Sequence, residues 1–262
     1  MRSVALLHGF TGCPESWDPV TALLPDDLEV LRPALRGHDP ALIDEERIGF
    51  EDEVDRLARW LTERTTAPTH LAGYSMGGRV ALGLLVRHRH LFHSATLIGV
   101  HPGIADPGER RRRAASDEAL ARRLETQGIE DFVDRWQELP LFESQRRLPA
   151  AVRERQRTLR LRQRPKGLAL ALRTLGAAAM PDYRGDLPSL DLPIRLLAGA
   201  SDDKFRRIAR AMARSLPQGS LEIVPGAGHN LILEASRAVA AAILEAVAPP
   251  PHTPARPKGT IR

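Results

Sequence analysis

The chain has 262 residues, 42% of them hydrophobic, and it carries a formal net charge of +5 and a single cysteine, Cys13. This composition suits a soluble globular protein with one large domain and an insertion, and one cysteine excludes an intramolecular disulfide. Because no apolar run is long enough to span a membrane and the first is too short for a signal peptide, we expect a cytoplasmic protein without membrane attachment.

Short apolar runs alternate with segments of helical periodicity along most of the chain. Strands are predicted at residues 4–7, 29–31, 70–73, 95–100, 194–199 and 221–224. Helices are predicted at residues 17–24, 51–64, 76–86, 206–216 and 231–247. This alternation predicts an α/β fold with a mostly parallel, twisted sheet and helices on both of its faces.

The alternation breaks between residues 101 and 185, which show helical patterns but no strand pattern. This segment holds 18 Lys and Arg residues against 12 Asp and Glu, whereas the rest of the chain holds 20 against 21. We therefore predict a core at 1–100 and 186–248, a helical Arg-rich cap at 101–185, and a disordered Pro-rich tail at 249–262. Positive charge confined to one segment favours a small anionic ligand over nucleic acid.

The stretch Gly73-Tyr74-Ser75-Met76-Gly77-Gly78-Arg79 lies between a predicted strand and a predicted helix. A Gly-x-Ser-x-Gly in this position is typical of a nucleophile elbow, a turn so tight that it needs glycine on either side of the serine. The turn exposes the serine hydroxyl at the N-terminus of the helix, where negative charge is favoured. Ser75 is therefore a candidate catalytic residue.

Two further side chains complete a possible catalytic triad in the chain order serine, acid, histidine. Asp202 follows the strand predicted at 194–199, and His229 follows the strand predicted at 221–224. A serine needs an imidazole to take its proton, and the imidazole needs a carboxylate to fix its tautomer. Asp203 is the alternative to Asp202 as the acid, and each residue taken alone is also compatible with a structural role.

An oxyanion site would complete this arrangement. The backbone N–H of Met76 directly follows the candidate nucleophile, and that of Phe10 lies in the glycine loop after the first strand. In hydrolases of this fold two such N–H groups bind developing negative charge.

With its neighbouring segments, this pattern resembles the MenH family, the 2-succinyl-6-hydroxy-2,4-cyclohexadiene-1-carboxylate synthases of menaquinone biosynthesis. The resemblance rests on the nucleophile segment through Arg79 and on Asp202-Asp203-Lys204-Phe205. The cap contributes His101-Pro102-Gly103-Ile104, Glu109-Arg110, Arg113, Asp117, Trp136 and Pro140-Leu141-Phe142. The resemblance covers nearly the whole chain up to the final helix.

The resemblance implies an α/β-hydrolase fold and an elimination in place of a hydrolysis. The substrate would be 2-succinyl-5-enolpyruvyl-6-hydroxy-3-cyclohexene-1-carboxylate, from which Ser75, made basic by His229, removes a ring proton so that pyruvate leaves. It implies no metal and no organic cofactor. We expect a monomer that acts on a small polycarboxylate.

Three substrate carboxylates would need cations, and arginine binds a carboxylate with two hydrogen bonds. Arg79 lies one helical turn after Ser75, so its side chain can reach the same opening. The family resemblance adds Arg113 and Arg162 from the cap, with Arg160 and Arg164 as alternatives to Arg162. It also adds two side chains as shape and hydrogen-bonding partners, Tyr74 and Trp136.

The chain departs from the family pattern in two places. It begins almost on the first strand, so we expect that the leading hairpin of many relatives is either missing or lost to the choice of start site. The family's Pro-Gly-His-Gly stretch is replaced by Leu35-Arg36-Gly37-His38-Asp39, which raises the question whether Arg36 crowds or enriches the site.

Two other functions fit the same residues. A carboxylesterase or C–C bond hydrolase would use the same triad with Ser75 as a covalent nucleophile. A non-catalytic receptor for small acids would keep the fold without turnover.

Overall fold

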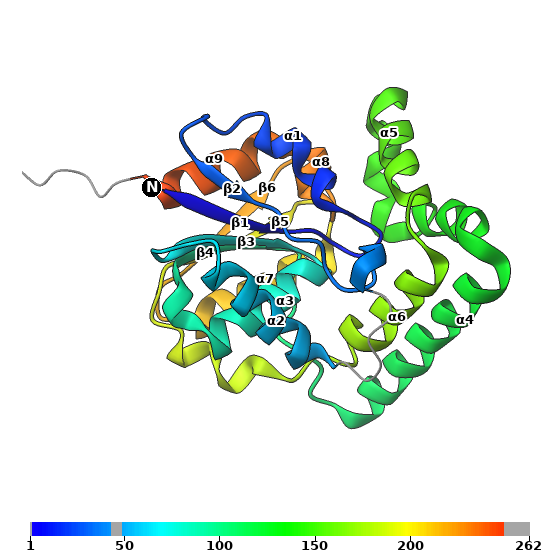
Figure 1. Cartoon of the computed structure of the whole chain (residues 1–262), viewed down its shortest axis with the longest axis horizontal. Helices are drawn as coiled ribbons and strands as arrows, with labels where there is room; N and C mark the ends of the chain where they lie inside the picture. Colours follow the sequence, from blue (N-terminus) through cyan, green and yellow to red (C-terminus); the bar gives the residue numbers. More distant parts are fainter. Residues whose placement is uncertain (1, 43–48, 249–262) are drawn as a thin grey trace, which may run out of the picture.

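The structure is a computed structural model that describes residues 2–42 and 49–248, so the predicted tail at 249–262 lies outside the described residues. Six strands form one parallel sheet in the order β2-β1-β3-β4-β5-β6 (Figure 1). They are β1 (Ser3–Leu7), β2 (Glu29–Leu31), β3 (Thr69–Tyr74), β4 (Phe92–Ile98), β5 (Ile194–Gly199) and β6 (Gly219–Val224). The predicted α/β fold is confirmed.

Helices cover both faces of this sheet (Figure 1). One face carries α2 (Phe50–Thr62), α3 (Met76–Arg87) and α7 (Asp203–Ser215), and the other carries α1 (Asp18–Thr21), α8 (Leu231–Glu234) and α9 (Ser236–Val247). Alternate residues of β1 enter the two cores, Ala5 and Leu7 on the first face and Val4 and Leu6 on the second. Because both faces are covered, β1 is apolar at each of these positions.

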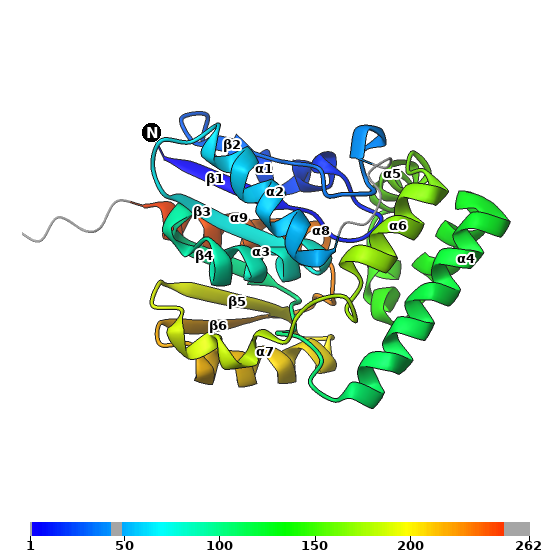
Figure 2. The same cartoon turned by 60° about the horizontal axis from the view of Figure 1, so that its bottom comes forward.

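A helical insertion connects β4 to β5. It contains α4 (Pro107–Gln137), α5 (Ala150–Leu161), α6 (Pro165–Leu175) and the 3-10 helix Pro140–Arg147. Helices α4 and α6 run side by side beyond the carboxyl ends of the strands (Figure 2). They share a small core that includes Leu124, Phe132, Leu168 and Leu172. The cap thus has its own apolar contacts and covers the edge of the sheet where the candidate catalytic residues lie.

Three predicted elements differ from the observed ones. The strand predicted at 95–100 ends at Ile98 because Gly99 adopts a φ of 61°, outside the strand region. The helix predicted at 17–24 is a 3-10 turn followed by the short α1. The single helix predicted at 231–247 is two helices, broken at Ala235, whose φ of −144° is not helical. This last break has a consequence for the site, because the preceding Glu234 folds back onto the loop of His229.

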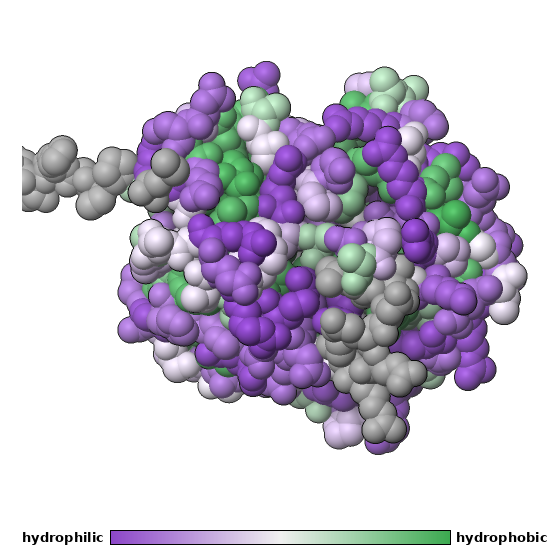
Figure 3. All heavy atoms as spheres, in the orientation of Figure 1, coloured by the Kyte–Doolittle hydropathy of each residue, from purple (hydrophilic) through white to green (hydrophobic). Residues whose placement is uncertain are grey.

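Hydrophilic residues cover most of the face shown in Figure 3, with smaller apolar areas between them. In the described part of the chain, the large apolar side chains that are exposed are Leu23 and Leu139. None of the helices in residues 2–42 and 49–248 combines the length and apolar character that a membrane span requires.

Candidate active site

Ser75 occupies the sharp turn between β3 and α3. Its φ of 52° and ψ of −109° are strained for a residue with a side chain, at a cost of about 1–3 kcal/mol. The turn requires glycine nearby: a Cβ on Gly73 would lie 2.7 Å from the carbonyl oxygen of Gly77, and a Cβ on Gly77 would collide with the carbonyls of Leu7 and His8. Gly73 lets β3 approach the first turn of α3, and Gly77 lets that turn pack against the end of β1; this packing holds the serine hydroxyl above the sheet.

Ser75, His229 and Asp202 form a continuous hydrogen-bonded chain. His229 Nε2 lies 3.0 Å from Ser75 Oγ, and His229 Nδ1 lies 2.7 Å from Asp202 Oδ2. Because a carboxylate can only accept, Nδ1 carries the proton and Nε2 is left to accept the proton of the serine hydroxyl. The other Asp202 oxygen accepts the backbone N–H of Phe205 at 3.1 Å, which fixes the carboxylate at the N-terminus of α7.

The structure separates the two candidate acids. Asp202 is buried against His229, whereas the side chain of Asp203 is 77% exposed and forms an ion pair with Arg206 at 2.6 Å. Only Asp202 is therefore placed to orient the imidazole.

The loop that carries His229 is held by a residue that the sequence analysis did not single out. Glu234 accepts the N–H of Gly228 at 2.8 Å with one oxygen and the N–H of Asn230 at 3.1 Å with the other. These N–H groups belong to the residues immediately before and after His229. The ring of Phe205, 4.6 Å from the imidazole between centroids, packs against it as well. One carboxylate thus fixes the backbone on both sides of the histidine.

The two residues that carry the candidate oxyanion donors, Phe10 and Met76, line the same cavity as Ser75. Met76 is the first residue of α3, where backbone N–H groups have no acceptor within the helix. Phe10 lies in a tight loop in which Gly9 accepts the N–H of Gly12 at 3.0 Å. His8 Nδ1 donates to Gly9 at 2.9 Å, and burial lowers the pKa of His8 to about 4, so this imidazole is neutral at neutral pH. The neutral His8 therefore supports the loop without adding charge.

Ser75 and His229 open into a cavity of about 470 Å³ between the core and the cap, which we call the central cavity. Every predicted site residue except Asp202 and Arg162 lines it: Phe10, Tyr74, Ser75, Met76, Arg79, Arg113, Trp136 and His229. Trp136 stacks on Phe132 at 5.5 Å and meets Phe10 edge-on at 5.1 Å. Its Nε1 is buried and has no hydrogen-bond partner among the described residues.

Arg79 is the buried cation of the central cavity. It is 9% exposed and donates to the carbonyl of Leu175 at 2.8 Å, and its Nε has no hydrogen-bond partner in residues 2–42 and 49–248. Burial, with a smaller contribution from nearby Arg113, lowers the pKa of Arg79 to about 10, so it remains protonated at neutral pH. A charged group with an unused donor is suited to bind an anion.

Arg113 reaches the same cavity from the cap but is already paired. Its side chain is 41% exposed and contacts the carboxylate of Asp117 at 2.6 Å, four residues further along α4. This ion pair partly offsets the positive charge that Arg113 brings to the cavity.

The structure does not bring Arg162 to the triad. Arg162 and its neighbour Arg164 line a separate pocket with Cys13 and His38, so this prediction is wrong for the described conformation. Arg160, the alternative, points to a cavity that it shares with Tyr74. Arg36 is buried against Glu53, with its Nε 3.5 Å from the carboxylate, and does not line the central cavity.

Metal-binding residues do not gather anywhere in the described part: no group of three or more His, Cys, Asp or Glu side chains there is arranged to hold an ion.

Comparisons with known proteins identify relatives of this chain. A model of the alpha/beta hydrolase family matches residues 4–242. A 2-succinyl-6-hydroxy-2,4-cyclohexadiene-1-carboxylate synthase of Enterobacter sp. (strain 638) is 33% identical over 92% of this chain and 90% of its own length. Among solved structures, MenH from S. aureus matches with a TM-score of 0.90 and 32% identity, covering 94% of this chain and 93% of that one.

The chain belongs to the MenH family of α/β hydrolases. This membership makes it an enzyme, a lyase of menaquinone biosynthesis on an α/β-hydrolase fold. The family resemblance found from the sequence is therefore confirmed. A thermophilic esterase from Thermogutta terrifontis, solved with malate bound, is also similar to this MenH chain, with a TM-score of 0.81 and 29% identity over 94% of it and 89% of the esterase.

Proposed function

We propose that this MenH chain eliminates pyruvate from 2-succinyl-5-enolpyruvyl-6-hydroxy-3-cyclohexene-1-carboxylate to give 2-succinyl-6-hydroxy-2,4-cyclohexadiene-1-carboxylate. The observation that carries this proposal is the hydrogen-bonded chain Ser75–His229–Asp202 at a cavity that also holds the buried Arg79. A base and a carboxylate-binding cation in one cavity are what a proton abstraction from a polycarboxylate needs.

The first step is removal of the proton from the ring carbon that bears the succinyl group. Ser75 Oγ takes this proton while its own proton passes to His229 Nε2, 3.0 Å away. The buried Asp202 then faces the imidazolium at 2.7 Å and stabilises its charge. The electron pair moves through the ring double bond, the bond to the enolpyruvyl oxygen breaks, and the departing enolate takes up a proton to become pyruvate.

Negative charge builds up on the succinyl carbonyl oxygen during proton removal. The N–H groups of Phe10 and Met76 are the donors for this oxygen. They are backbone groups fixed by the Gly9–Gly12 loop and by α3, so they need little rearrangement as the charge develops.

The substrate's carboxylates account for the basic side chains of the cavity. Arg79 offers a buried guanidinium with a free Nε, and Arg113 offers a second one from α4. Tyr74 and Trp136 supply the aromatic walls and, through Trp136 Nε1, a further hydrogen-bond donor.

The test is pyruvate release from the enolpyruvyl substrate, generated by the preceding pathway enzyme and followed by coupled pyruvate detection. We expect stoichiometric pyruvate from the wild type and nearly none from Ser75→Ala or His229→Ala, with unchanged thermal unfolding. A tenth or more of the wild-type rate in either variant would contradict the role of the triad.

The similarity to the Thermogutta esterase favours one second candidate, an ester hydrolase with Ser75 as covalent nucleophile. Both reactions use the same residues, so covalency distinguishes them. A hydrolase is acylated at Ser75 and cleaves p-nitrophenyl acetate at a substantial rate. Clear ester hydrolysis without pyruvate release, in one preparation, would support the hydrolase.

A further inference from the structure

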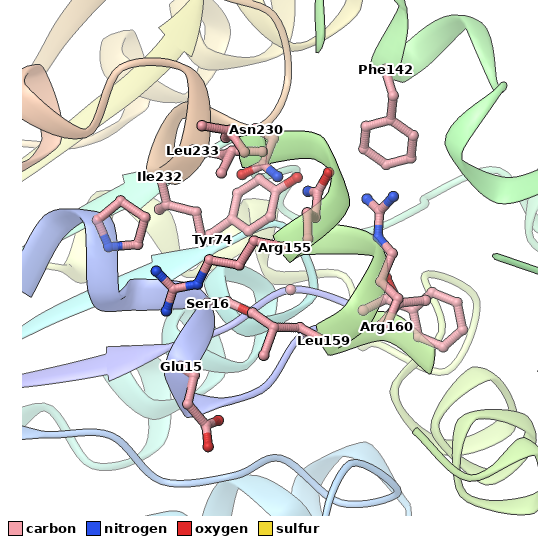
Figure 4. Close-up of a pocket in the computed structure, with 17 residues that line it drawn as sticks. Glu15, Ser16, Tyr74, Phe142, Arg155, Leu159, Arg160, Asn230, Ile232 and Leu233 are labelled. Atoms are coloured by element: carbon pink, nitrogen blue, oxygen red, sulfur yellow. The ribbon is translucent and has the colours of Figure 1, made fainter. Parts of the chain in front are cut away.

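The Gly9–Gly12 loop, which carries the candidate oxyanion donor Phe10, borders two cavities. All four of its residues line a cavity of about 130 Å³ between the core and α5, where Tyr74 and Leu159 are among the other side chains (Figure 4). Phe10 also lines the central cavity. Because side chains pack against only part of the loop, its conformation depends strongly on its hydrogen bonds.

The direction of the Phe10 N–H is set by the carbonyl of Gly9, because the two groups belong to one planar, trans peptide unit. In such a unit the N–H and the C=O point in opposite directions. The Gly9 oxygen accepts two hydrogen bonds, one from the N–H of Gly12 at 3.0 Å and one from His8 Nδ1 at 2.9 Å. These two donors therefore direct the Phe10 N–H without contacting it.

The imidazole of His8 is held in turn by a backbone group. Leu35 donates its N–H to His8 Nε2 at 3.2 Å, so Nε2 is unprotonated and the ring proton lies on Nδ1, from which it is donated to Gly9. His8 is fully buried, so both ring nitrogens depend on these protein partners. Leu35 thus fixes the orientation and the tautomer of the imidazole.

Two charged side chains of α2 hold the peptide groups on either side of Leu35. Arg56 Nη2 donates to the carbonyl of Ala34 at 3.0 Å, and this carbonyl shares a peptide unit with the Leu35 N–H. Glu53 Oε1 accepts the N–H of Arg36 at 3.0 Å, and this N–H shares a peptide unit with the Leu35 carbonyl. Glu53 also accepts two hydrogen bonds of 2.7 Å from Arg56, one on each oxygen. Glu53 therefore holds both peptide groups, one directly and one through Arg56.

The reaction itself gives Glu53 no role, since α2 contributes none of the residues that line the central cavity. Glu53 is 0% exposed, where an ionised carboxylate is costly unless it is paired and hydrogen-bonded. The family's Pro-Gly-His-Gly stretch has proline at the place of Arg36, and proline has no N–H to donate. The hydrogen bond from Arg36 to Glu53 is therefore one that this chain's own sequence makes possible.

We propose that Glu53 is a positioning residue for the oxyanion site. Through the peptide groups beside Leu35, it directs the Leu35 N–H toward His8. His8 then holds the Gly9 carbonyl, so that the Phe10 N–H points toward the developing negative charge. Glu53 itself contacts no substrate. This inference rests on the proposed function, in which Phe10 is an oxyanion donor, and it names the residue that sets the direction of that donor.

The first test is Glu53→Gln, which keeps the shape of the side chain but weakens its hold on Arg56. We expect kcat for pyruvate release to fall about ten-fold with KM unchanged, less than the loss of roughly 10²–10³-fold that follows deletion of an oxyanion donor. Cleavage of p-nitrophenyl acetate should fall by the same factor, because ester hydrolysis uses the same donors. The rates are measured well below the melting temperature of each variant, so that unfolding does not contribute to them.

Two variants on α2 control for charge and for stability. Glu51→Gln removes the same charge from an exposed position, where it pairs with Arg87, and should keep kcat within two-fold of the wild type. Leu57→Ala truncates a buried side chain and should lower the melting temperature at least as far as Glu53→Gln does, again with kcat within two-fold. If Leu57→Ala lost as much kcat as Glu53→Gln, Glu53 would act only through stability and the inference would be overturned.

A double-mutant cycle tests the path through His8. His8→Phe keeps a ring at this position but removes both of its hydrogen bonds, so adding Glu53→Gln to it should change kcat by less than two-fold. If the two effects multiply, Glu53 does not act through His8 and the inference is wrong. If Glu53→Gln fails to fold, Arg56→Gln takes its place in the cycle, because it removes the hydrogen bond to the Ala34 carbonyl from a partly exposed side chain.

The outcome is separable from that of the pyruvate assay, because p-nitrophenyl acetate cleavage depends on the same oxyanion donors. If no pyruvate is released but Glu53→Gln slows ester cleavage through His8, the proposed reaction is wrong and the positioning role stands. If pyruvate is released and Glu53→Gln leaves kcat unchanged on both substrates, only the inference is wrong.

Discussion

The core side and the cap side of the central cavity hold their functional groups by different means. On the core side, Ser75, His229 and Asp202 are linked to one another, and backbone hydrogen bonds hold Asp202 and the His229 loop in place. On the cap side, Arg113 extends from a helix, is 41% exposed and is held by one ion pair with a neighbour on that helix. The geometry of the core side therefore depends on strand ends, tight turns and their hydrogen bonds.

This difference matches what each side has to do. Proton transfer needs atoms held at hydrogen-bond distance, so the core side must be preorganised. Recognition of a carboxylate depends on charge and tolerates more movement. We therefore expect substitutions of the triad and of the residues that position it to reduce every reaction of the enzyme, and substitutions of the arginines to affect carboxylate substrates selectively.

The largest expected effect separates the two neighbouring acids. Asp202→Asn keeps the shape of the side chain but loses the charge that fixes the imidazole tautomer, so the rate of pyruvate release should fall roughly 10³–10⁴-fold. Asp203→Asn is the matched control, and since Asp203 is exposed and paired only with Arg206, its rate should stay within two-fold of the wild type. Comparable losses in both variants would remove Asp202 from the triad.

The next effect in size is that of the buried arginine. Arg79→Gln removes a guanidinium with a free Nε from the central cavity, and we expect kcat/KM for the tricarboxylate to fall by about thirty- to several-thousand-fold. Cleavage of p-nitrophenyl acetate, which carries no carboxylate, should change little. Arg87→Gln, at an exposed position on the same helix, is the control. Equal losses on both substrates would show that Arg79 acts through the structure.

Glu234 should behave as a positioning residue. Glu234→Gln keeps one acceptor but loses the charge and one of the two hydrogen bonds beside His229, so kcat should fall about ten- to a hundred-fold. Because the effect passes through His229, pyruvate release and p-nitrophenyl acetate cleavage should fall by the same factor, with KM unchanged. A lower melting temperature with normal kcat would mean that Glu234 only stabilises the fold.

The sequence was sufficient to predict the hydrogen-bonded set Ser75–His229–Asp202 because each member lies in the loop or turn after a strand and carries a local signal. It did not separate Asp202 from Asp203, since adjacent residues share the same local signal. The structure separates them because Asp202 caps α7, whereas Asp203 begins that helix and faces solvent. Glu234 was missed for a different reason: the apolar periodicity of 231–247 hides the break at Ala235, which ends the short helix that carries Glu234.

The cap arginines could not be oriented from the sequence. In an Arg-rich helix the apolar pattern is weak, so the sequence does not show which face of the helix, and therefore which arginine, points to the site. Arg160 and Arg162 are two residues apart, about 200° around a helix, so they face nearly opposite directions. Helix α5 also ends at Leu161, which directs Arg162 toward the pocket beside Cys13. The family resemblance therefore predicted arginines in the cap without fixing which of them faces the site.

The smallest effect expected in this comparison is that of Arg113. Since this side chain is partly exposed and shares its charge with Asp117, Arg113→Gln should raise KM for the tricarboxylate by only about five- to ten-fold and leave kcat nearly unchanged. Arg111→Gln removes one charge from an exposed position on α4, so it is the control for the effect of the overall positive charge of the cap. Two results would contradict the contrast between the cap side and the core side. One is a loss of activity on the tricarboxylate as large in Arg113→Gln as in Arg79→Gln, and the other is an equal loss of p-nitrophenyl acetate cleavage in Arg113→Gln. Either result would show that the cap side is as constrained as the core side.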